Sequence, residues 1–156
     1  MEISVLGLDK HKTETLVKEL NVLLANFQIY YQNVRGLHWN IKGKNFFELH
    51  VKFEEFYTDA QEKVDLIAER ILTLQGTPLH TFSDYEALAK VPVGKNISKD
   101  VEAVKLVVDS LSELLKIERA ILEVSDEAND EGTNSMMSDF IAEQEKTLWM
   151  MNAWLG

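Results

Sequence analysis

Four long stretches of the chain carry apolar residues at intervals of three and four, and this spacing constrains the fold most strongly. The stretches run from Asp9 to His38, from Phe46 to Gln75, from Ser98 to Ser125 and from Asn134 to Leu155. Only two prolines and seven glycines occur in the 156 residues, so little interrupts the pattern. No strand-like alternation competes with it, and the sequence therefore predicts an all-α protein built from four long helices.

The lengths of the connections predict how these helices are arranged. Ile41 to Asn45 join the first two stretches, and the short acidic segment EVSDEANDEGTN joins the last two, so each pair is expected to be antiparallel. About 20 residues, Gly76 to Ile97, lie between the pairs. A helix of about 28 residues is about 42 Å long, and a connection of this length can cross that distance. We therefore expect one domain over residues 1–156, a ferritin-like four-helix bundle with one long crossover.

Local patterns predict where some helices begin and end. Asn45 followed by Glu48 is typical of a helix start, and Gly76-Thr77-Pro78 of a helix end. Ser83 followed by Glu86 forms a capping pattern within the crossover. The sequence therefore predicts a short helix between the second and third long helices.

Composition and motifs exclude several classes of function. The chain has no cysteine, which excludes disulfides, thiolate metal sites, iron–sulfur clusters and cysteine nucleophiles. The glycine-rich and nucleophile motifs GxGxxG, P-loop and GxSxG are absent. A net charge of −10 disfavours binding to phosphate backbones and favours cations. Because no apolar run approaches the roughly 20 residues of a membrane span and no signal-peptide pattern occurs, we expect a cytoplasmic protein without a membrane segment.

Two histidines and two carboxylates are the strongest candidates for chemistry. His38 ends the first predicted helix and His50 begins the second, so the turn brings both to one end of the pair. Asp65 and Glu69 are four residues apart and share one face of the second helix. Singly, a histidine can cap a helix and carboxylates can form a solvated stripe. Together they form a mixed nitrogen and oxygen set suited to iron, manganese or zinc.

The spacing of these residues predicts that the site is shared between subunits. His50 and Asp65 are 15 residues apart on one helix, or about 22 Å, so one chain cannot place both on one ion. At 100° per residue their directions differ by about 60°, so both face one side. A two-fold dimer with antiparallel second helices would join His38 and His50 of one subunit to Asp65 and Glu69 of the other. Ferritin-like di-iron proteins carry Glu-x-x-His inside the bundle; this chain has none, so we expect an apolar core.

Over essentially its whole length the chain resembles the Dps family, the DNA-protection-during-starvation miniferritins. The resemblance rests on residues of the first two predicted helices: His38-Trp39, Gly43, His50 and Asp65-x-x-Ala68-Glu69-Arg70. It implies a ferroxidase that assembles a hollow shell of twelve subunits. Such a shell oxidises ferrous iron at di-iron sites between subunits, preferably with hydrogen peroxide and otherwise with dioxygen. It stores the ferric mineral inside, which protects against oxidative damage.

The resemblance also implies roles for individual residues. His38, His50, Asp65 and Glu69 would bind the tighter iron, two ligands from each subunit. Glu54 matches a position where the family often places a carboxylate near the second iron. Zinc and manganese are alternative metals for such a site.

Three further positions match the family outside this ligand set. Trp39 matches an aromatic residue beside the site, where it would donate electrons and limit radical escape, although packing alone is an equal alternative. Asp126 and Asp130 lie in the acidic junction that lines negative pores at three-fold axes in the family. A run of acidic residues like this one is also typical of a solvated loop.

Two rival functions are weighed against the ferroxidase. The first is a DNA-compacting structural shell. The DNA-binding members of the family use a lysine-rich tail before the first helix, whereas the nine residues before Lys10 here, MEISVLGLD, contain no lysine. A plain helical interaction protein with a degenerate metal site would not need the intact set His38, His50, Asp65 and Glu69. We therefore favour iron oxidation and storage, and expect little or no DNA binding.

Overall fold

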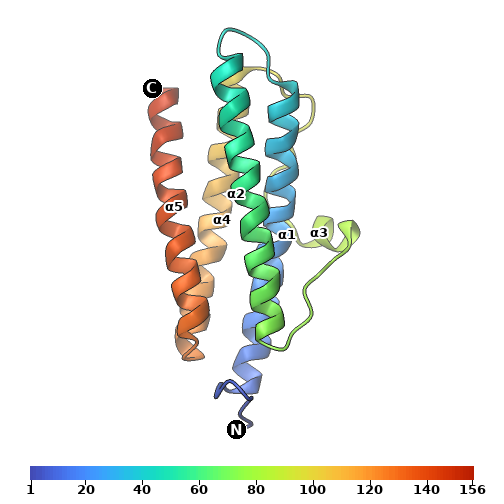
Figure 1. Ribbon diagram of the computed structural model, residues 1–156, viewed down its shortest axis with the longest axis vertical. Helices are drawn as coiled ribbons and strands as arrows, with labels where there is room; N and C mark the ends of the chain where they lie inside the picture. Colours follow the sequence, from blue (N-terminus) through green and yellow to red (C-terminus); the bar gives the residue numbers. More distant parts are fainter.

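The computed structural model describes all 156 residues as a bundle of four long helices with a short fifth helix on its side (Figure 1). The helices are α1 (Lys10–Asn40), α2 (Phe46–Thr73), α3 (Phe82–Leu88), α4 (Asp100–Glu127) and α5 (Glu131–Leu155). α1 packs against α2, α4 packs against α5, and α1 also contacts α4. None of these helices is both long and apolar enough to cross a bilayer.

The crossover returns the chain to the end of the bundle where α1 stops. The backbone N–H of Lys42, just after α1, donates to the carbonyl of Ser98, just before α4, at 2.9 Å. α4 therefore starts beside the α1–α2 turn and runs parallel to α2, as Figure 1 shows. This confirms the predicted ferritin-like bundle with one long crossover.

Three asparagine side chains of α1 hold the crossover against the bundle. Asn21, Asn26 and Asn33 accept hydrogen bonds from backbone N–H groups of the crossover, those of Leu79 (2.8 Å), Lys90 (2.7 Å), Val91 (3.0 Å) and Gly94 (3.0 Å). Because the crossover has no strand partner, these amides satisfy backbone groups that would otherwise lose their bonds to water. The asparagines thus fix the path of a long irregular segment.

Two predicted helix caps differ in detail from the structure. α2 begins at Phe46 after Asn45, as predicted, but the Asn45 side chain makes no capping hydrogen bond; its amide instead donates to Asp100 at 2.7 Å and lowers the pKa of that carboxyl. The short helix α3 is capped by Thr81, which accepts from the Asp84 N–H at 3.3 Å, two residues before the predicted Ser83. At Asn45, a hydrogen bond to the distant Asp100 uses the side chain that the local pattern assigned to a helix cap.

The acidic junction between the last two helices is shorter than predicted. α4 continues to Glu127 and α5 already begins at Glu131, three residues before the predicted Asn134. Asp130 is the cap of α5, because its carboxylate accepts the N–H of Thr133 at 3.1 Å. Most of the acidic segment is therefore helical.

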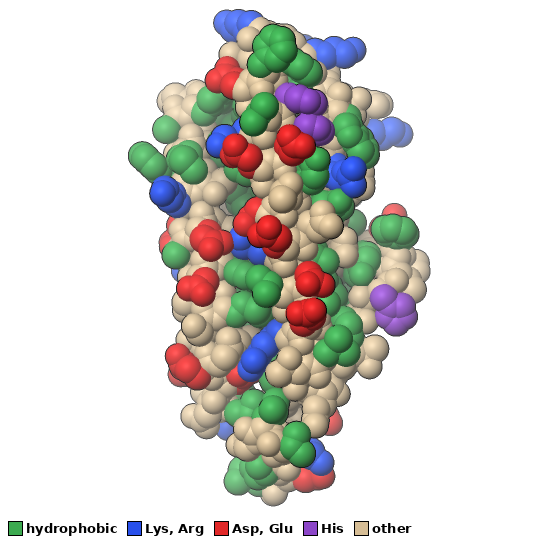
Figure 2. Space-filling view, viewed as in Figure 1, with side chains coloured by type: hydrophobic (Ala, Val, Ile, Leu, Met, Phe, Trp, Pro, Cys, Tyr) green, Lys and Arg blue, Asp and Glu red, His purple; other side chains and the backbone are tan.

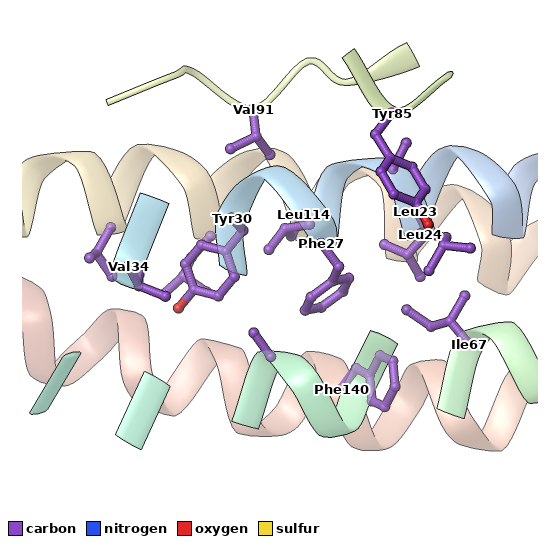
Figure 3. Packing of buried hydrophobic residues seen from close by; sticks show 14 of the residues in the cluster. Leu23, Leu24, Phe27, Tyr30, Val34, Ile67, Tyr85, Val91, Leu114 and Phe140 are labelled. Atoms are coloured by element: carbon purple, nitrogen blue, oxygen red, sulfur yellow. The ribbon is translucent and has the colours of Figure 1, made fainter. Parts of the chain in front are cut away.

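The core consists mainly of leucine, isoleucine and aromatic side chains from all four long helices, several of which Figure 3 shows interlocking. The largest fully buried ones are Phe27, Phe53, Leu16, Leu20, Leu23, Leu24, Ile67, Ile71, Leu111, Leu114, Ile121 and Met137. Burial of these side chains provides the main driving force for folding.

The expectation of an apolar core is wrong most clearly at one level of the bundle. Tyr30 of α1, Lys63 of α2, Glu118 of α4 and Gln144 of α5 are all buried, and we call these four residues the polar layer. Burial raises the pKa of Glu118 to about 8, and burial with the nearby Asp59 raises the pKa of Tyr30. The core thus contains ionisable groups that the amphipathic pattern did not suggest.

Candidate metal centre

The α1–α2 turn brings His38 and His50 into direct contact. Their rings stack with centroids 3.8 Å apart and an angle of 11° between the planes. Nδ1 of His38 lies 2.6 Å from the carbonyl oxygen of His50, and Nδ1 of His50 lies 2.7 Å from the carbonyl oxygen of His38. The predicted meeting of the two histidines at one end of the helix pair is therefore present in the structure.

This reciprocal bonding fixes which ring nitrogen carries the proton. A backbone carbonyl can only accept, so each neutral imidazole must donate from Nδ1. The Nε2 atoms are then left without protons, which is the form in which imidazole binds a metal. Hydrogen bonds from the second nitrogen to a carbonyl also hold metal-binding histidines in orientation. The two rings are therefore held in place through Nδ1, and each Nε2 has no hydrogen-bond partner within the chain.

Aromatic side chains support the histidines on both sides. Phe46 stacks on His50 with ring centroids 4.9 Å apart, and the edge of Tyr57 packs against His38 at 5.4 Å. The hydroxyl of Tyr57 donates a long hydrogen bond, 3.4 Å, to Oε1 of Glu54. Glu54 is exposed and lies one turn after His50, so its carboxylate belongs to the same end of α2.

Trp39 adjoins this group through Arg35. The guanidinium of Arg35 lies 5.0 Å from the Trp39 ring and 5.1 Å from the Tyr57 ring, and it donates to the hydroxyl of Tyr31 at 2.9 Å. The Trp39 side chain is 57% exposed. It therefore lies at the surface beside the partly buried Tyr31, Arg35 and Tyr57, and it fills no core position.

Asp65 and Glu69 lie further along α2 and do not meet the histidines. Both carboxylates are exposed, and within one chain no three histidine, aspartate or glutamate side chains come together as a metal site. The helical period nevertheless places them on the same outer stripe as Glu54. Figure 2 shows two adjacent histidines at the surface, with acidic side chains following the same face of the molecule.

The outer stripe of α2 also carries large apolar residues. Phe47, Val51 and Leu72 are 82%, 52% and 58% exposed. At about 100° per residue they share the stripe with Glu54, Asp65 and Glu69. An exposed row of apolar and acidic residues on one helix is typical of a surface that another protein covers.

The structure separates the two residues of the predicted pore. Asp126 is exposed, as a pore residue must be. Asp130 is buried, and its carboxylate binds Arg70 at 2.6 Å as well as the backbone N–H of Thr133. The pore prediction does not fit Asp130, because its charge is already neutralised inside the chain.

Sequence reasoning missed Tyr57 and Arg35 as parts of this region. A signal was present for both. Tyr57 is seven residues after His50, on the same face of α2, and Arg35 is three residues before His38 on α1. Helical spacing from the candidate ligands would have brought them into consideration.

Comparison with known proteins places this geometry in a family. The model of the Ferritin family, described as a ferritin-like domain, matches residues 17–156. A DNA protection during starvation protein of Porphyromonas gingivalis is 43% identical over 152 residues, which cover 97% of this chain and 96% of the relative. General stress protein 20U of Bacillus subtilis is 33% identical, over 90% or more of both chains.

Solved structures give the same result. The crystal structure of a Dps protein from Vibrio cholerae O1, described as a member of a broad superfamily of ferritin-like diiron-carboxylate proteins, superposes with a TM-score of 0.97. It is 50% identical, and the match covers 100% of this chain and 98% of that one. Dps from Staphylococcus aureus has a TM-score of 0.89 at 31% identity, over 92% and 96% of the two chains.

Proposed function

The chain belongs to the Dps family of ferritin-like proteins, and from this membership we propose that it oxidises ferrous iron at di-iron sites between subunits. The observation that carries the proposal is the division of one ligand set along α2. A preorganised pair of imidazoles lies at one end, and two exposed carboxylates lie on the same stripe about 22 Å away. Neither half can hold a metal securely alone, so each needs a second chain.

A two-fold axis reunites the halves. The midpoint between His50 and Asp65 falls next to Thr58, so an axis there sets two α2 helices antiparallel with Asp65 and Glu69 opposite the partner's imidazole pair. The same pairing would cover exposed apolar residues of the outer stripe. The dimer would therefore be stabilised by apolar burial and would contain two equivalent sites.

The ligand types suit ferrous iron as the substrate. Two Nε2 donors with carboxylates bind iron and leave positions open for an oxidant. Two irons supply one electron each, so hydrogen peroxide and two protons yield two ferric ions and two waters without a hydroxyl radical. Dioxygen is the alternative oxidant. Glu54, oriented by Tyr57, would serve the second iron, and Trp39 would supply an electron when only one iron is bound.

We propose further that the dimers assemble into a cytoplasmic shell of twelve subunits that stores the ferric mineral. In support, Asp126 is exposed at the junction of α4 and α5, and a carboxylate there would attract cations if the junction lines a pore. Zinc or manganese would compete for the same mixed ligand set.

Mixed shells test the division of the site between chains. One variant carries His38→Gly and His50→Gly, and the other carries Asp65→Ala and Glu69→Ala. Each variant alone should lose fast ferrous oxidation after anaerobic iron loading and one pulse of peroxide, followed by absorbance. In a mixed dimer, one of the two sites regains all four ligands while the other has none.

Fast oxidation should therefore return in mixed shells, up to roughly half of the wild-type sites when every dimer is mixed. Native mass measurement of the same samples confirms that both chains are present and reports the number of subunits. Mixed shells as slow as either parent would exclude the shared site. Full activity in either parent alone would exclude the proposed ligands.

We expect no stable complex with linear duplex DNA. The chain is strongly acidic, with a net charge of −10, and Lys10 forms an ion pair with Glu2. At about 150 mM salt the Debye length is about 8 Å, so scattered lysines contribute little beyond their immediate surroundings. A gel shift with micromolar shell that persists at this salt concentration would favour the DNA-compacting alternative.

A further inference from the structure

Tyr57 is the only tyrosine or tryptophan whose ring packs against the histidine pair. Its ring and that of His38 lie nearly at right angles, at 73°, with centroids 5.4 Å apart. No such packing joins the ring of Trp39 to either histidine, because neighbouring residues of a helix point about 100° apart. An electron that moves toward an iron bound by His38 therefore has its most direct aromatic source in Tyr57.

The hydroxyl of Tyr57 also has a proton acceptor within the chain. It donates to Oε1 of Glu54 at 3.4 Å, from one turn further along α2. A phenol that loses an electron becomes a strong acid, so a carboxylate at its hydroxyl lets the proton leave together with the electron. The indole N–H of Trp39 has no hydrogen-bond partner within the chain. Oxidation of Tyr57 can therefore give a neutral radical directly, whereas Trp39 first becomes a cation.

Arg35 increases this difference between the two rings. Its guanidinium lies 5.1 Å from the Tyr57 ring and 5.0 Å from the Trp39 ring. No carboxylate of the chain forms an ion pair with Arg35, and its buried Nε has no hydrogen-bond partner. Its positive charge therefore opposes the formation of a second positive charge on either ring. A neutral Tyr57 radical avoids that repulsion.

We propose that Tyr57 supplies the second electron to peroxide when only one iron is bound, and that Trp39 then reduces Tyr57 in turn. This inference rests on the proposed oxidation of iron, and it identifies the first aromatic donor and the order of transfer. Arg35 contacts both rings and so lies between the two donors. When a second iron is bound, Glu54 would be its ligand and could not accept the proton, so Tyr57 would stay reduced.

Electrons and protons balance in two steps. In the first, ferrous iron and Tyr57 each give one electron to hydrogen peroxide, which takes two protons from solvent and becomes two waters. The hydroxyl proton of Tyr57 moves to Glu54. In the second step, Trp39 gives one electron to the Tyr57 radical, which regains its proton from Glu54, and the oxidised indole releases its proton to water. Without an aromatic donor, one iron would reduce peroxide to hydroxide and a hydroxyl radical.

Electron paramagnetic resonance of freeze-quenched shells tests the proposal. Wild-type shells loaded anaerobically with one Fe(II) per site and mixed with one equivalent of peroxide should give a tyrosyl radical, whose signal narrows when the tyrosines are ring-deuterated. At two Fe(II) per site the signal per iron should fall about threefold or more. In Tyr57→Phe the tyrosyl signal should be lost, and spin-trapped hydroxyl radical should rise about threefold or more, because only slower donors of the second electron remain.

Two further variants make the result specific. Tyr31→Phe is the matched control, because the Tyr31 ring lies 6.1 Å from that of Tyr57 but contacts neither histidine. It should give wild-type amounts of both radicals. Trp39→Phe should lengthen the lifetime of the tyrosyl radical about threefold or more, because the residue that reduces Tyr57 is gone.

Wild-type shells at two Fe(II) per site separate this inference from the proposed function. If they do not oxidise iron quickly, the proposed function is wrong and this inference is wrong with it. If they do, the absence of a tyrosyl radical at one Fe(II) per site overturns this inference alone. An unchanged tyrosyl signal in Tyr57→Phe, or a normal yield of hydroxyl radical there, has the same consequence.

The order of transfer has its own outcome. An unchanged lifetime of the tyrosyl radical in Trp39→Phe, or a tryptophan radical that forms as fast in Tyr57→Phe as in wild type, would overturn it. If Tyr57→Phe does not assemble, the unaltered chain decides the matter. A tyrosyl signal per iron that does not fall between one and two Fe(II) per site would then overturn the proposal, and a fall would support it.

Discussion

The inner and outer faces of α2 both carry charged residues, but the charges on the two faces are compensated in different ways. On the inner face, Lys63 is surrounded by two carboxylates from its own chain. On the outer face, Asp65 and Glu69 are exposed and form no ion pair. A buried charge must be compensated by groups of the same chain because little water reaches it, whereas an exposed charge is solvated by water and needs no partner within the chain. The comparison separates charged groups that are paired within the subunit from charged groups that remain exposed on its surface, where the proposed partner subunit would meet them.

The histidine pair occupies a position between these two cases. Each Nδ1 is bound to a carbonyl of the same chain, while Nε2 remains free. The chain therefore holds both imidazoles in place by itself, and in the function proposed above a second subunit would supply the remaining ligands. A metal site formed between two subunits requires that each subunit orients its own ligands through hydrogen bonds within its chain.

The largest effect expected from the inner face is a pH dependence of stability. The pKa of Glu118 is raised from 4.5 to about 8 in the folded chain, so the unfolded chain releases this proton first. Stability should fall as pH rises from the unfolded value through the folded one and then level off. Glu118→Gln should remove this dependence, and its stability relative to wild type should rise by on the order of 4 kcal/mol between pH 5 and pH 9.

Urea denaturation at fixed protein concentration across this pH range measures the effect. Glu123→Gln, an exposed position on the same helix, is the matched control and should show no such trend. A difference between Glu118→Gln and wild type that stays constant with pH would mean that Glu118 titrates normally.

A smaller effect is expected from two neighbouring carboxylates at the α4–α5 junction. Asp130→Ala removes both a helix cap and the partner of Arg70, and should cost about 3 kcal/mol of unfolding free energy. Asp126→Ala, at an exposed position, should change stability by less than about 0.5 kcal/mol. Asp126→Ala should nevertheless slow mineral growth if it lines a pore.

Denaturation curves and iron uptake kinetics of both variants check this contrast. Unchanged uptake in Asp126→Ala would count against the pore. Equal stability of the two variants would contradict the buried ion pair between Arg70 and Asp130.

The smallest effect concerns the tautomers of the histidines, and it is seen in spectra rather than in the oxidation rate or the unfolding free energy. His38 and His50 should both carry the proton on Nδ1, because each Nδ1 faces a backbone carbonyl. Solid-state ¹⁵N spectra of shells labelled at histidine distinguish the two ring nitrogens, and the single variants His38→Gly and His50→Gly assign the signals. An Nε2-protonated form at either residue in the metal-free protein would show that the pair is not preorganised for binding.

The amphipathic pattern determined most of the fold. Helical spacing predicted the four long helices, and the lengths of the connections predicted their order and the crossover, because both follow from geometry along the chain. The same reasoning separated His50 from Asp65, since the rise per residue of a helix is fixed. The sequence even held a signal for the polar layer, because Glu118 lies on the apolar stripe of Leu111, Leu114 and Ile121.

Only the tertiary structure decided which partners the polar residues take. The pairing of Lys63 with Glu143, of Arg70 with Asp130 and of Asn45 with Asp100 joins residues at least 55 positions apart. The Asn45 side chain, which the local pattern assigned to a cap, makes no capping hydrogen bond, whereas Asp130, which was predicted to line a pore, caps α5. Local propensities differ by about 1 kcal/mol, so a charged or buried hydrogen bond to a distant element can outweigh them. Which of the two interactions a polar side chain makes, the local cap or the distant hydrogen bond, is therefore decided only when the helices pack.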